Sequence, residues 1–267
     1  MNKPALLHLF SITLSGCLAL PAFARKQETG FLDRTVSYGG VTYRYQVFVP
    51  ANFDPHKKWP IVLFLHGAGE RGDNGLLQTD VGLGHAIRNT TRDLPFVAVM
   101  PQCRANTHWM DPTMQAQALA ALEDSIKEFK ADRERIYLTG ISMGGYGTWD
   151  LAAKYPGKFA AYVVLCGGIR GPDSFPELHV DLVDDPKVTD PYTETARRIG
   201  KTPVWIFHGD ADPAVPVAES RKMAQALDHA GANVRYTEYP GVGHYSWDKA
   251  YAEPGLVEWL LQQKLGK

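Results

Sequence analysis

Ser142 is the residue whose surroundings most clearly predict chemistry. It stands in the sequence Gly140-Ile-Ser-Met-Gly144, after the short apolar segment 136–139 and before a segment of helical character at 147–154. A serine in such a strand–turn–helix context is held in a strained conformation that exposes its hydroxyl group. The flanking glycines remove Cβ atoms that would collide in the turn. This arrangement predicts that Ser142 is a nucleophile.

A serine nucleophile needs a general base and a group that orients the base. His244 lies in a glycine-rich loop after a predicted strand, and we predict it as the base. Asp212 follows the preceding predicted strand and would hold His244 in the correct tautomer. Asp210 follows the same strand, and we expect its side chain to shape the turn through an Asx hydrogen bond.

The same chemistry requires two hydrogen-bond donors for the oxyanion that forms during acyl transfer. The backbone N–H of Met143 is one candidate, because it directly follows the nucleophile. The second donor would come from the loop His66-Gly67-Ala68, which follows another predicted strand, and we predict the N–H of Ala68.

The hydrophobic pattern predicts the elements that bring these residues together. Continuous apolar runs predict buried strands, and apolar residues at helical spacing predict amphipathic helices. The predicted strands are 61–65, 96–100, 136–139, 161–165, 204–207 and 234–239, and the predicted helices are 82–89, 116–129, 147–154, 193–199, 217–230 and 254–265. Alternation around Gly39-Gly40 predicts an antiparallel hairpin over 31–50. Together these elements indicate an α/β fold with a mostly parallel, doubly wound sheet.

Length and composition favour one catalytic domain over residues 25–267. A chain of 267 residues with 45% hydrophobic residues can bury one large core. Residues 169–201 are rich in Pro and Asp, and we predict an insertion there at the rim of the active site. The net charge of −1, without a basic run, argues against nucleic acid as a partner. We expect a monomer.

Residues 1–24 have the features of a signal peptide. The segment 6–20 is mostly apolar but too short for a stable membrane span, and Ala22-Phe-Ala24 forms a cleavage site of the small-x-small type. We therefore expect a periplasmic or secreted protein. The alternative is a lipoprotein anchored at Cys17, because Leu14-Ser-Gly-Cys17 resembles a lipobox.

Two cysteines, Cys103 and Cys166, lie beyond this leader near the ends of two predicted strands. Three strand spacings of about 4.8 Å would separate them, which exceeds the Cα limit of about 7 Å for a disulfide. We predict two free, partly buried thiols. The His, Cys, Asp and Glu residues show no metal-ligand spacing, so we expect neither a metal nor a cofactor.

The motifs also resemble a known group of enzymes between about residues 35 and 265. Four sequences carry the likeness: Leu65-His-Gly-Ala-Gly-Glu-Arg-Gly72, Gly140-Ile-Ser-Met-Gly-Gly-Tyr-Gly-Thr-Trp149, His208-Gly-Asp-Ala-Asp212 and Gly243-His244. They resemble serine esterases of the α/β-hydrolase superfamily, in the polyhydroxybutyrate-depolymerase-like, feruloyl-esterase-like and dienelactone-hydrolase-like group, whose members are often labelled predicted peptidases. The resemblance implies the α/β-hydrolase fold and hydrolysis of carboxylic esters through an acyl-enzyme. A peptidase, a lipase or a non-catalytic binding protein of the same fold are the alternatives.

We predict the residues that contact the substrate only from their positions in the sequence. Loops and helix starts at the predicted active-site end contain Glu70, Gln102, Trp109, Tyr146 and Trp247. Aromatic walls there would suit an aryl ester or a sugar face. We therefore expect a small acyl, acetyl or feruloyl ester as substrate, either free or linked to polysaccharide. The two tryptophans are equally compatible with loop packing.

Overall fold

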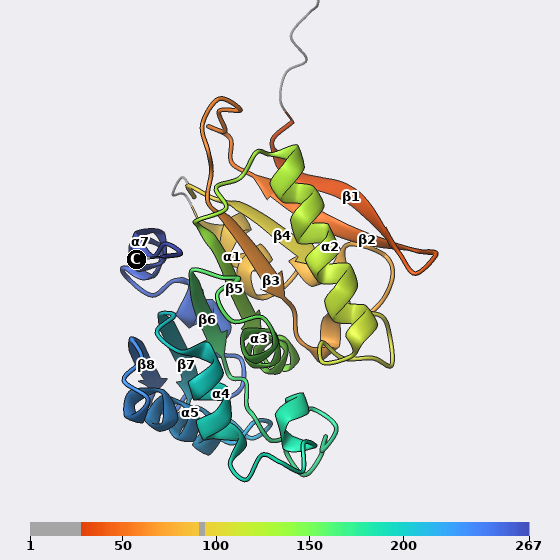
Figure 1. Cartoon of the computed structure of the whole chain (residues 1–267). Coiled ribbons are helices and arrows are strands. Elements are labelled where there is room, and N and C mark those ends of the chain that lie inside the picture. The colour runs from red at the N-terminus through yellow and green to blue at the C-terminus, as the bar shows by residue number, and fades with distance from the viewer. Residues whose placement is uncertain (1–27, 91–93, 267) are drawn as a thin grey trace, which may run out of the picture.

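One eight-stranded sheet forms the centre of the protein, with the strand order β1-β2-β4-β3-β5-β6-β7-β8 (Figure 1). The computed structural model describes residues 28–90 and 94–266, so the predicted signal peptide 1–24 and Cys17 lie outside the described residues. The strands are β1 (Gly30–Tyr38), β2 (Val41–Val49), β3 (Ile61–Leu65), β4 (Val97–Pro101), β5 (Ile136–Ile141), β6 (Ala161–Leu165), β7 (Val204–Gly209) and β8 (Val234–Tyr239). β2 pairs antiparallel with both β1 and β4, and the pairs from β4 to β8 are parallel. The predicted fold class is therefore confirmed.

Helices cover both faces of the sheet. They are α1 (Gly82–Asn89), α2 (Pro112–Glu128), α3 (Met143–Lys154), α4 (Pro191–Ile199), α5 (Ala218–His229), α6 (Trp247–Tyr251) and α7 (Leu256–Gln262). In Figure 1, α2, α3 and α4 lie in front of the sheet and α1 lies behind it. Successive strand residues point to opposite faces, so Leu63 packs in the core under α2 to α5, whereas Phe64 packs with α1, α6 and α7. None of the helices in the described part of the chain is long and apolar enough to span a membrane.

The strand order changes direction at β3, which defines where a ligand can bind. The chain passes from β3 to β4 on one side and then returns to place β5 on the other side of β3. The loops after β3 and β5 therefore diverge and leave a crevice at the carboxyl ends of the strands. Leu65 of β3 lies opposite Gly140 of β5, so the His66 loop and the Ser142 turn begin side by side.

Two helices begin four residues earlier than the hydrophobic pattern predicted. α2 begins at Pro112 because the Asp111 side chain caps it, accepting hydrogen bonds from the N–H groups of Thr113 and Met114. α3 begins at Met143 rather than at 147. Its first turn contains glycines, which are poor helix formers and obscure the helical signal in the sequence.

The C-terminal region differs from the single helix predicted over 254–265. α7 is shorter than this prediction, and the five-residue α6 precedes it. α6 is too short to produce a recognisable apolar period, which explains why the sequence did not reveal it.

The segment predicted as an insertion, 169–201, has two parts. Its second half contains α4, which connects β6 to β7 and packs its buried residues in the core with α3 and α5. Its first half includes the 3₁₀ turn Asp181–Val183. Lys154 of α3 anchors this half, because its ammonium group lies 2.6 Å from the buried Asp150 carboxylate and 2.5 Å from Asp181. Because α4 is part of the ordinary connection between β6 and β7, only the first half of the segment is an insertion. Its position at the rim of the active site stays a prediction.

Cys103 and Cys166 follow β4 and β6, two strands that are separated by β3 and β5. Both thiols are free, as predicted. The prediction that they are only partly buried was wrong, since neither residue has exposed surface. Each lies at a strand end that loops and helices cover completely.

His66 joins the loop after β3 to the loop after β4. Its Nδ1 lies 2.6 Å from the carbonyl oxygen of Gly67, and its Nε2 lies 2.9 Å from the backbone nitrogen of Cys103. Because a carbonyl only accepts and a backbone N–H only donates, Nδ1 carries the proton and Nε2 accepts. Burial lowers the pKa of His66 to about 4, against the opposing effect of the Gly67 carbonyl, and the Arg71 guanidinium lowers it further. The folded protein therefore contains a neutral His66.

We predict that His66 makes the fold sensitive to mild acid. Its pKa falls from 6.5 to about 4 on folding, so its full stabilising contribution is present above pH 6.5. Below that pH, His66 binds a proton in the unfolded chain but stays neutral in the folded protein. The free energy of unfolding therefore falls by up to about 1.4 kcal/mol per pH unit. Urea unfolding of the wild type and of His66→Gln at about pH 7.5 and about pH 5 measures this effect.

The expected result is a smaller loss of stability for His66→Gln than for the wild type between the two pH values. A difference between the two proteins that is constant from about pH 7.5 to about pH 8.5 serves as the internal control, because His66 is neutral in both states there. Equal losses at about pH 5 would contradict the prediction.

Candidate active site

Ser142 occupies the turn between β5 and α3 with a φ of 50°. Non-glycine residues rarely adopt such a left-handed conformation, and here the packing around the turn maintains it. A Cβ atom at Gly140 would lie 2.1 Å from the carbonyl oxygen of Gly144, and one at Gly144 would lie 1.9 Å from that of Leu65. Both positions therefore require glycine, and the turn is pressed against the end of β3.

His244 connects the side chains of Ser142 and Asp212. The Ser142 hydroxyl donates to His244 Nε2 over 2.9 Å, and His244 Nδ1 donates to Asp212 Oδ2 over 2.7 Å. Since an ionised carboxylate only accepts, Nδ1 carries the proton and the lone pair of Nε2 faces the serine hydroxyl. The structure thus joins residues that are 102 and 32 positions apart in the chain. Ser142 and His244 retain some exposure to solvent.

The Asp212 carboxylate has no exposed surface and is fully hydrogen-bonded. Its Oδ2 also accepts from Nε2 of the buried His208 over 3.1 Å. Its Oδ1 accepts from the backbone N–H groups of Ala214 and Val215. Burial alone would raise the pKa of Asp212, but the hydrogen bonds from His208, His244 and Val215 outweigh burial and hold this pKa well below its ordinary value. Asp212 is therefore an anion at neutral pH.

Asp210 lies in the same turn but does not reach His244. Its carboxylate accepts the backbone N–H of Gly241 over 2.6 Å, which ties the turn after β7 to the loop after β8. The Asx hydrogen bond that we expected for Asp210 is made by Asp212 instead, with the N–H of Ala214 two residues further on. Both carboxylates shape loops, and only Asp212 contacts the histidine.

The two predicted oxyanion donors stand at the starts of helices. Met143 is the first residue of α3, and Ala68 is the first residue of the 3₁₀ helix Ala68–Glu70. N–H groups at such positions have no acceptor within their own helix. A Cβ atom at Gly67 would lie 3.8 Å from the Ser142 Cβ, so the loop that carries Ala68 runs directly beside the serine.

Two side chains hold this loop in place. Arg71 Nε donates to the carbonyl oxygen of Ala68 over 2.9 Å, and its Nη1 donates to that of Thr107 over 3.2 Å. The Glu70 carboxylate accepts the backbone N–H of Gly67. Burial raises the pKa of Glu70, and the N–H groups of Gly67 and Glu70 oppose this rise. Glu70 keeps 17% of its side chain exposed, so its predicted contact with substrate remains open to test.

Three of the predicted substrate residues are buried and support the site from below, which corrects our prediction. Trp109 has no exposed surface, and its indole N–H donates to the carbonyl oxygen of His66. Tyr146 is equally buried, and its hydroxyl donates to the carbonyl oxygen of Arg170. Gln102 is 2% exposed and binds the loop around Gly75 through both ends of its amide. Their position in the sequence near strand ends did not reveal that other loops cover them.

Two aromatic residues flank the histidine. Trp247 is only 8% exposed and packs its ring edge-on against the His244 ring at 5.5 Å, so it supports the base. Tyr245 is 80% exposed, and its ring lies 6.2 Å from that of His244. We did not predict Tyr245, although its position directly after His244 was a usable signal. Tyr245 offers an exposed aromatic ring at the site, whereas Trp109 and Tyr146 are buried and offer none.

Cys166 is a second residue that the sequence did not assign to the site. Its thiol, one His244 nitrogen and one Asp212 oxygen all lie within 4.8 Å of one another. The thiol also approaches the backbone N–H of Ser142 and the hydroxyl of Ser246. Burial raises the pKa of Cys166 to about 12, so the thiol is neutral. The three donors are far apart in the chain, which is why sequence spacing gave no sign of the cluster.

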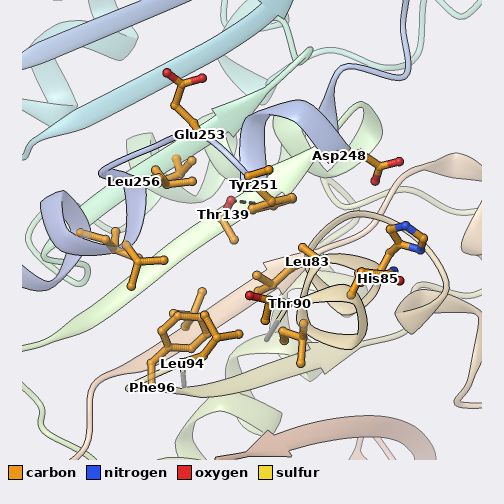
Figure 2. A pocket seen from close by; sticks show the side chains of 18 of the residues that line it. Leu83, His85, Thr90, Leu94, Phe96, Thr139, Asp248, Tyr251, Glu253 and Leu256 are labelled. Atoms are coloured by element: carbon orange, nitrogen blue, oxygen red, sulfur yellow. Dashed lines mark hydrogen bonds between the residues drawn. The ribbon is translucent and has the colours of Figure 1, made fainter. Parts of the chain in front are cut away.

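A separate cavity of about 390 Å³ lies on the opposite side of the sheet, between α1, α6 and α7. Figure 2 shows Leu83, Phe96 and Leu256 around it, with the Thr139 hydroxyl hydrogen-bonded to that of Tyr251. The lining residues include none of those that we predicted for the site. Thr139 lies in β5, three residues before Ser142, but its side chain lines this cavity on the other face of the sheet, so the cavity is not part of the serine site.

Comparisons with known proteins agree with this architecture. The chain is 36% identical over 132 residues to acyl-protein thioesterase 1 of Gibberella zeae, and this match covers 49% of each chain. It is 25% identical over 232 residues to an "uncharacterized secreted protein" of Arthroderma benhamiae, covering 79% of this chain and 24% of the other. The crystal structure of a thermostable esterase superposes with a TM-score of 0.69 and 32% identity, covering 88% of this chain and 63% of the esterase.

The chain thus spans about half or less of the length of these two sequence relatives. The family model of the dienelactone hydrolase family matches residues 99–252. This match extends from β4 to the end of α6, and Ser142, Asp212 and His244 all fall within it. Since it covers more than half of the 267 residues, the chain belongs to the dienelactone hydrolase family.

Proposed function

We propose that the protein is a serine hydrolase that cleaves carboxylic esters through an acyl-enzyme. The observation that carries the proposal is the hydrogen-bonded series from the Ser142 hydroxyl through His244 to the buried Asp212 anion. Membership of the dienelactone hydrolase family and the likeness to a thermostable esterase support ester hydrolysis.

In the first step, Ser142 Oγ attacks the carbonyl carbon of the ester, and its proton passes to His244 Nε2. The imidazolium that forms is stabilised by Asp212, which already accepts its Nδ1–H. The geometry favours this step because the proton moves along an existing hydrogen bond of 2.9 Å. The left-handed turn at Ser142 supports attack, since it directs the hydroxyl away from the helix that follows.

The carbonyl oxygen becomes an oxyanion, which the N–H groups of Met143 and Ala68 would bind. His244 then returns the proton to the leaving alcohol, and the acyl group stays on Ser142. A water molecule, deprotonated by His244, attacks the acyl carbon and releases the carboxylic acid. Arg71 supports this arrangement, because its hydrogen bond to the Ala68 carbonyl holds the loop that carries the second donor.

For the substrate, we propose a small ester with an acetyl or an aromatic acyl group such as feruloyl. Tyr245 offers an exposed ring beside His244, which suits stacking against an aryl group. The same acyl-enzyme route would cleave a thioester, and the similarity to acyl-protein thioesterase 1 makes thioesters a worthwhile comparison. A peptidase or a lipase of the same fold remains the alternative.

We further propose that the protein is exported. The charge, length and cleavage motif of residues 1–24 support a signal peptide, and one relative is described as a secreted protein. The anchored lipoprotein with Cys17 as its first residue is the alternative.

We predict a clear ranking among three variants of the site. Ser142→Ala should lower kcat/KM for p-nitrophenyl acetate by about 10³-fold or more, because the nucleophile is lost. Asp212→Asn should lower it by about 10²- to 10⁴-fold, because the base loses its orienting anion. Asp210→Asn should cost no more than about tenfold, since it removes one hydrogen bond to a loop.

Steady-state kinetics with each purified variant measure this ranking, and circular dichroism checks that each is folded. Near-normal turnover by Ser142→Ala would overturn the nucleophile. If Asp210→Asn is the crippled variant and Asp212→Asn is not, the assignment of the acid is wrong.

We predict that Tyr245 contributes to binding of aromatic esters. Tyr245→Ala should raise KM for methyl ferulate by about 2- to 10-fold, the range expected for one aromatic contact, while KM for p-nitrophenyl acetate changes less. Tyr155→Ala is the matched control, because Tyr155 is also exposed but follows the far end of α3, roughly 18 Å from Ser142. Equal effects of the two variants would remove Tyr245 from the substrate site, and faster cleavage of peptide amides than of any ester would favour the peptidase.

The proposed export gives a defined N-terminus. Mass spectrometry of the protein recovered from a bacterial host should give a chain that begins at Arg25, because cleavage follows Ala24. A lipidated chain that begins at Cys17 would establish the lipoprotein alternative. A chain that retains residues 1–24 would contradict both forms of export.

A further inference from the structure

Cys166 places a thiol directly behind the proposed catalytic residues. It follows β6 with a φ of 39°, and its backbone N–H donates to the carbonyl oxygen of Phe207 on β7. Its Sγ, one Asp212 oxygen and one His244 nitrogen lie within 4.8 Å of one another. The reaction proposed above uses Asp212 and His244 but gives this thiol no role.

A second, independent feature marks the same position. The Ser246 hydroxyl is buried, and within the described part of the chain only the Cys166 thiol, a weak hydrogen-bonding group, lies in position to partner it. A buried hydroxyl with so weak a partner is costly, and such groups call for an explanation such as a bound ion or water. The cluster therefore contains three donors of different chemistry and one weakly bonded oxygen next to them.

The donor set selects the kind of cation. Thiolate and imidazole are ligands of zinc and of similarly soft divalent ions, whereas magnesium and calcium prefer sites made of oxygen atoms alone. Zinc binds sulfur at about 2.3 Å and nitrogen or oxygen at about 2.0–2.2 Å, which places tetrahedral ligands roughly 3.3–3.7 Å apart. Donor atoms within 4.8 Å reach these separations through side-chain shifts of about 1 Å.

We propose that Cys166, Asp212 and His244 form an inhibitory site for zinc or a similarly soft divalent cation. On binding, the ion displaces the thiol proton to solvent and accepts the lone pair of one nitrogen of the neutral His244. One proton is released for each ion bound, and no group is oxidised or reduced. The partly exposed His244 side chain provides the route from solvent.

The inhibition rests on the proposed role of His244 as general base, whereas the binding of the ion does not. The ion takes Nδ1, because this is the ring nitrogen that faces Asp212. The ring proton then moves to Nε2, and that nitrogen can no longer accept from serine. This removes the base while it leaves the serine chemically intact, so a chelator should restore activity.

Cadmium binding to the full chain tests the site without any measurement of activity. The wild type should show an ultraviolet band from thiolate-to-cadmium charge transfer at one equivalent of Cd²⁺. Cys166→Ala and Cys166→Ser should both lack this band, and having two variants guards against a folding defect in one. Cys103→Ala should keep it, because Cys103 is an equally buried thiol that contacts Thr107 instead.

Hydrolysis of p-nitrophenyl acetate in the presence of Zn²⁺ tests the inhibition. The wild type should lose activity and recover it with EDTA, and the Zn²⁺ concentration for half inhibition should rise by about tenfold or more in Cys166→Ser, relative to its own uninhibited rate. The absence of the band in the wild type, or its persistence in both Cys166 variants, would refute the site. A wild type that binds Cd²⁺ but resists Zn²⁺ would refute its inhibitory role.

A wild type that hydrolyses no ester at all would be a failure of the proposed function. In that case the cadmium band alone decides whether the three residues hold a cation.

Discussion

The buried carboxylate of Asp212 is the constraint on which the active-site end of the protein depends. A charge without access to water is tolerated only if its hydrogen-bonding capacity is filled. Donors from three places fill it: His208 at the end of β7, the backbone at Val215, and His244 in the loop after β8. The same bonds that keep Asp212 ionised also fix the position and tautomer of His244, so stability and the proposed chemistry share one group.

A different interaction holds Ser142, namely the close approach between the backbone of its turn and that of β3. The left-handed turn exists because Gly140 and Gly144 let the start of α3 press against the end of β3. That contact also brings the loop after β3 beside the serine, where the neutral His66 and Arg71 hold its carbonyl groups. The proposed oxyanion donors are therefore positioned by groups that need not touch a substrate, and buried Trp109 supports them from beneath.

Dense packing around the site has a chemical consequence as well. Strand β6 lies between β5, which leads to Ser142, and β7, which leads to Asp212, so the Cys166 thiol at the end of β6 enters the same space. A thiol there fills volume without charge, because burial keeps it protonated. Its nearness to imidazole and carboxylate creates a set of donors that a soft cation could exploit, although nothing in the proposed hydrolysis requires a metal.

The sequence by itself determined the order of the strands and of every helix except the short α6, together with the identity of the residues proposed to react. Strand and helix patterns depend on residues that are close together in the sequence, and the turn at Ser142 needs glycines two positions on either side. Both features can therefore be recognised from the sequence alone. Only the tertiary structure decided which residues meet: that Asp212 rather than Asp210 contacts His244, that Trp109, Tyr146 and Gln102 are covered, and that Tyr245 is exposed. Contact and burial depend on how separate strand ends pack together, and no pattern within a single segment records that packing. For the same reason, the sequence did not show that Cys166 lies beside Asp212 and His244. Cys166 follows β6, and no other predicted site residue follows that strand.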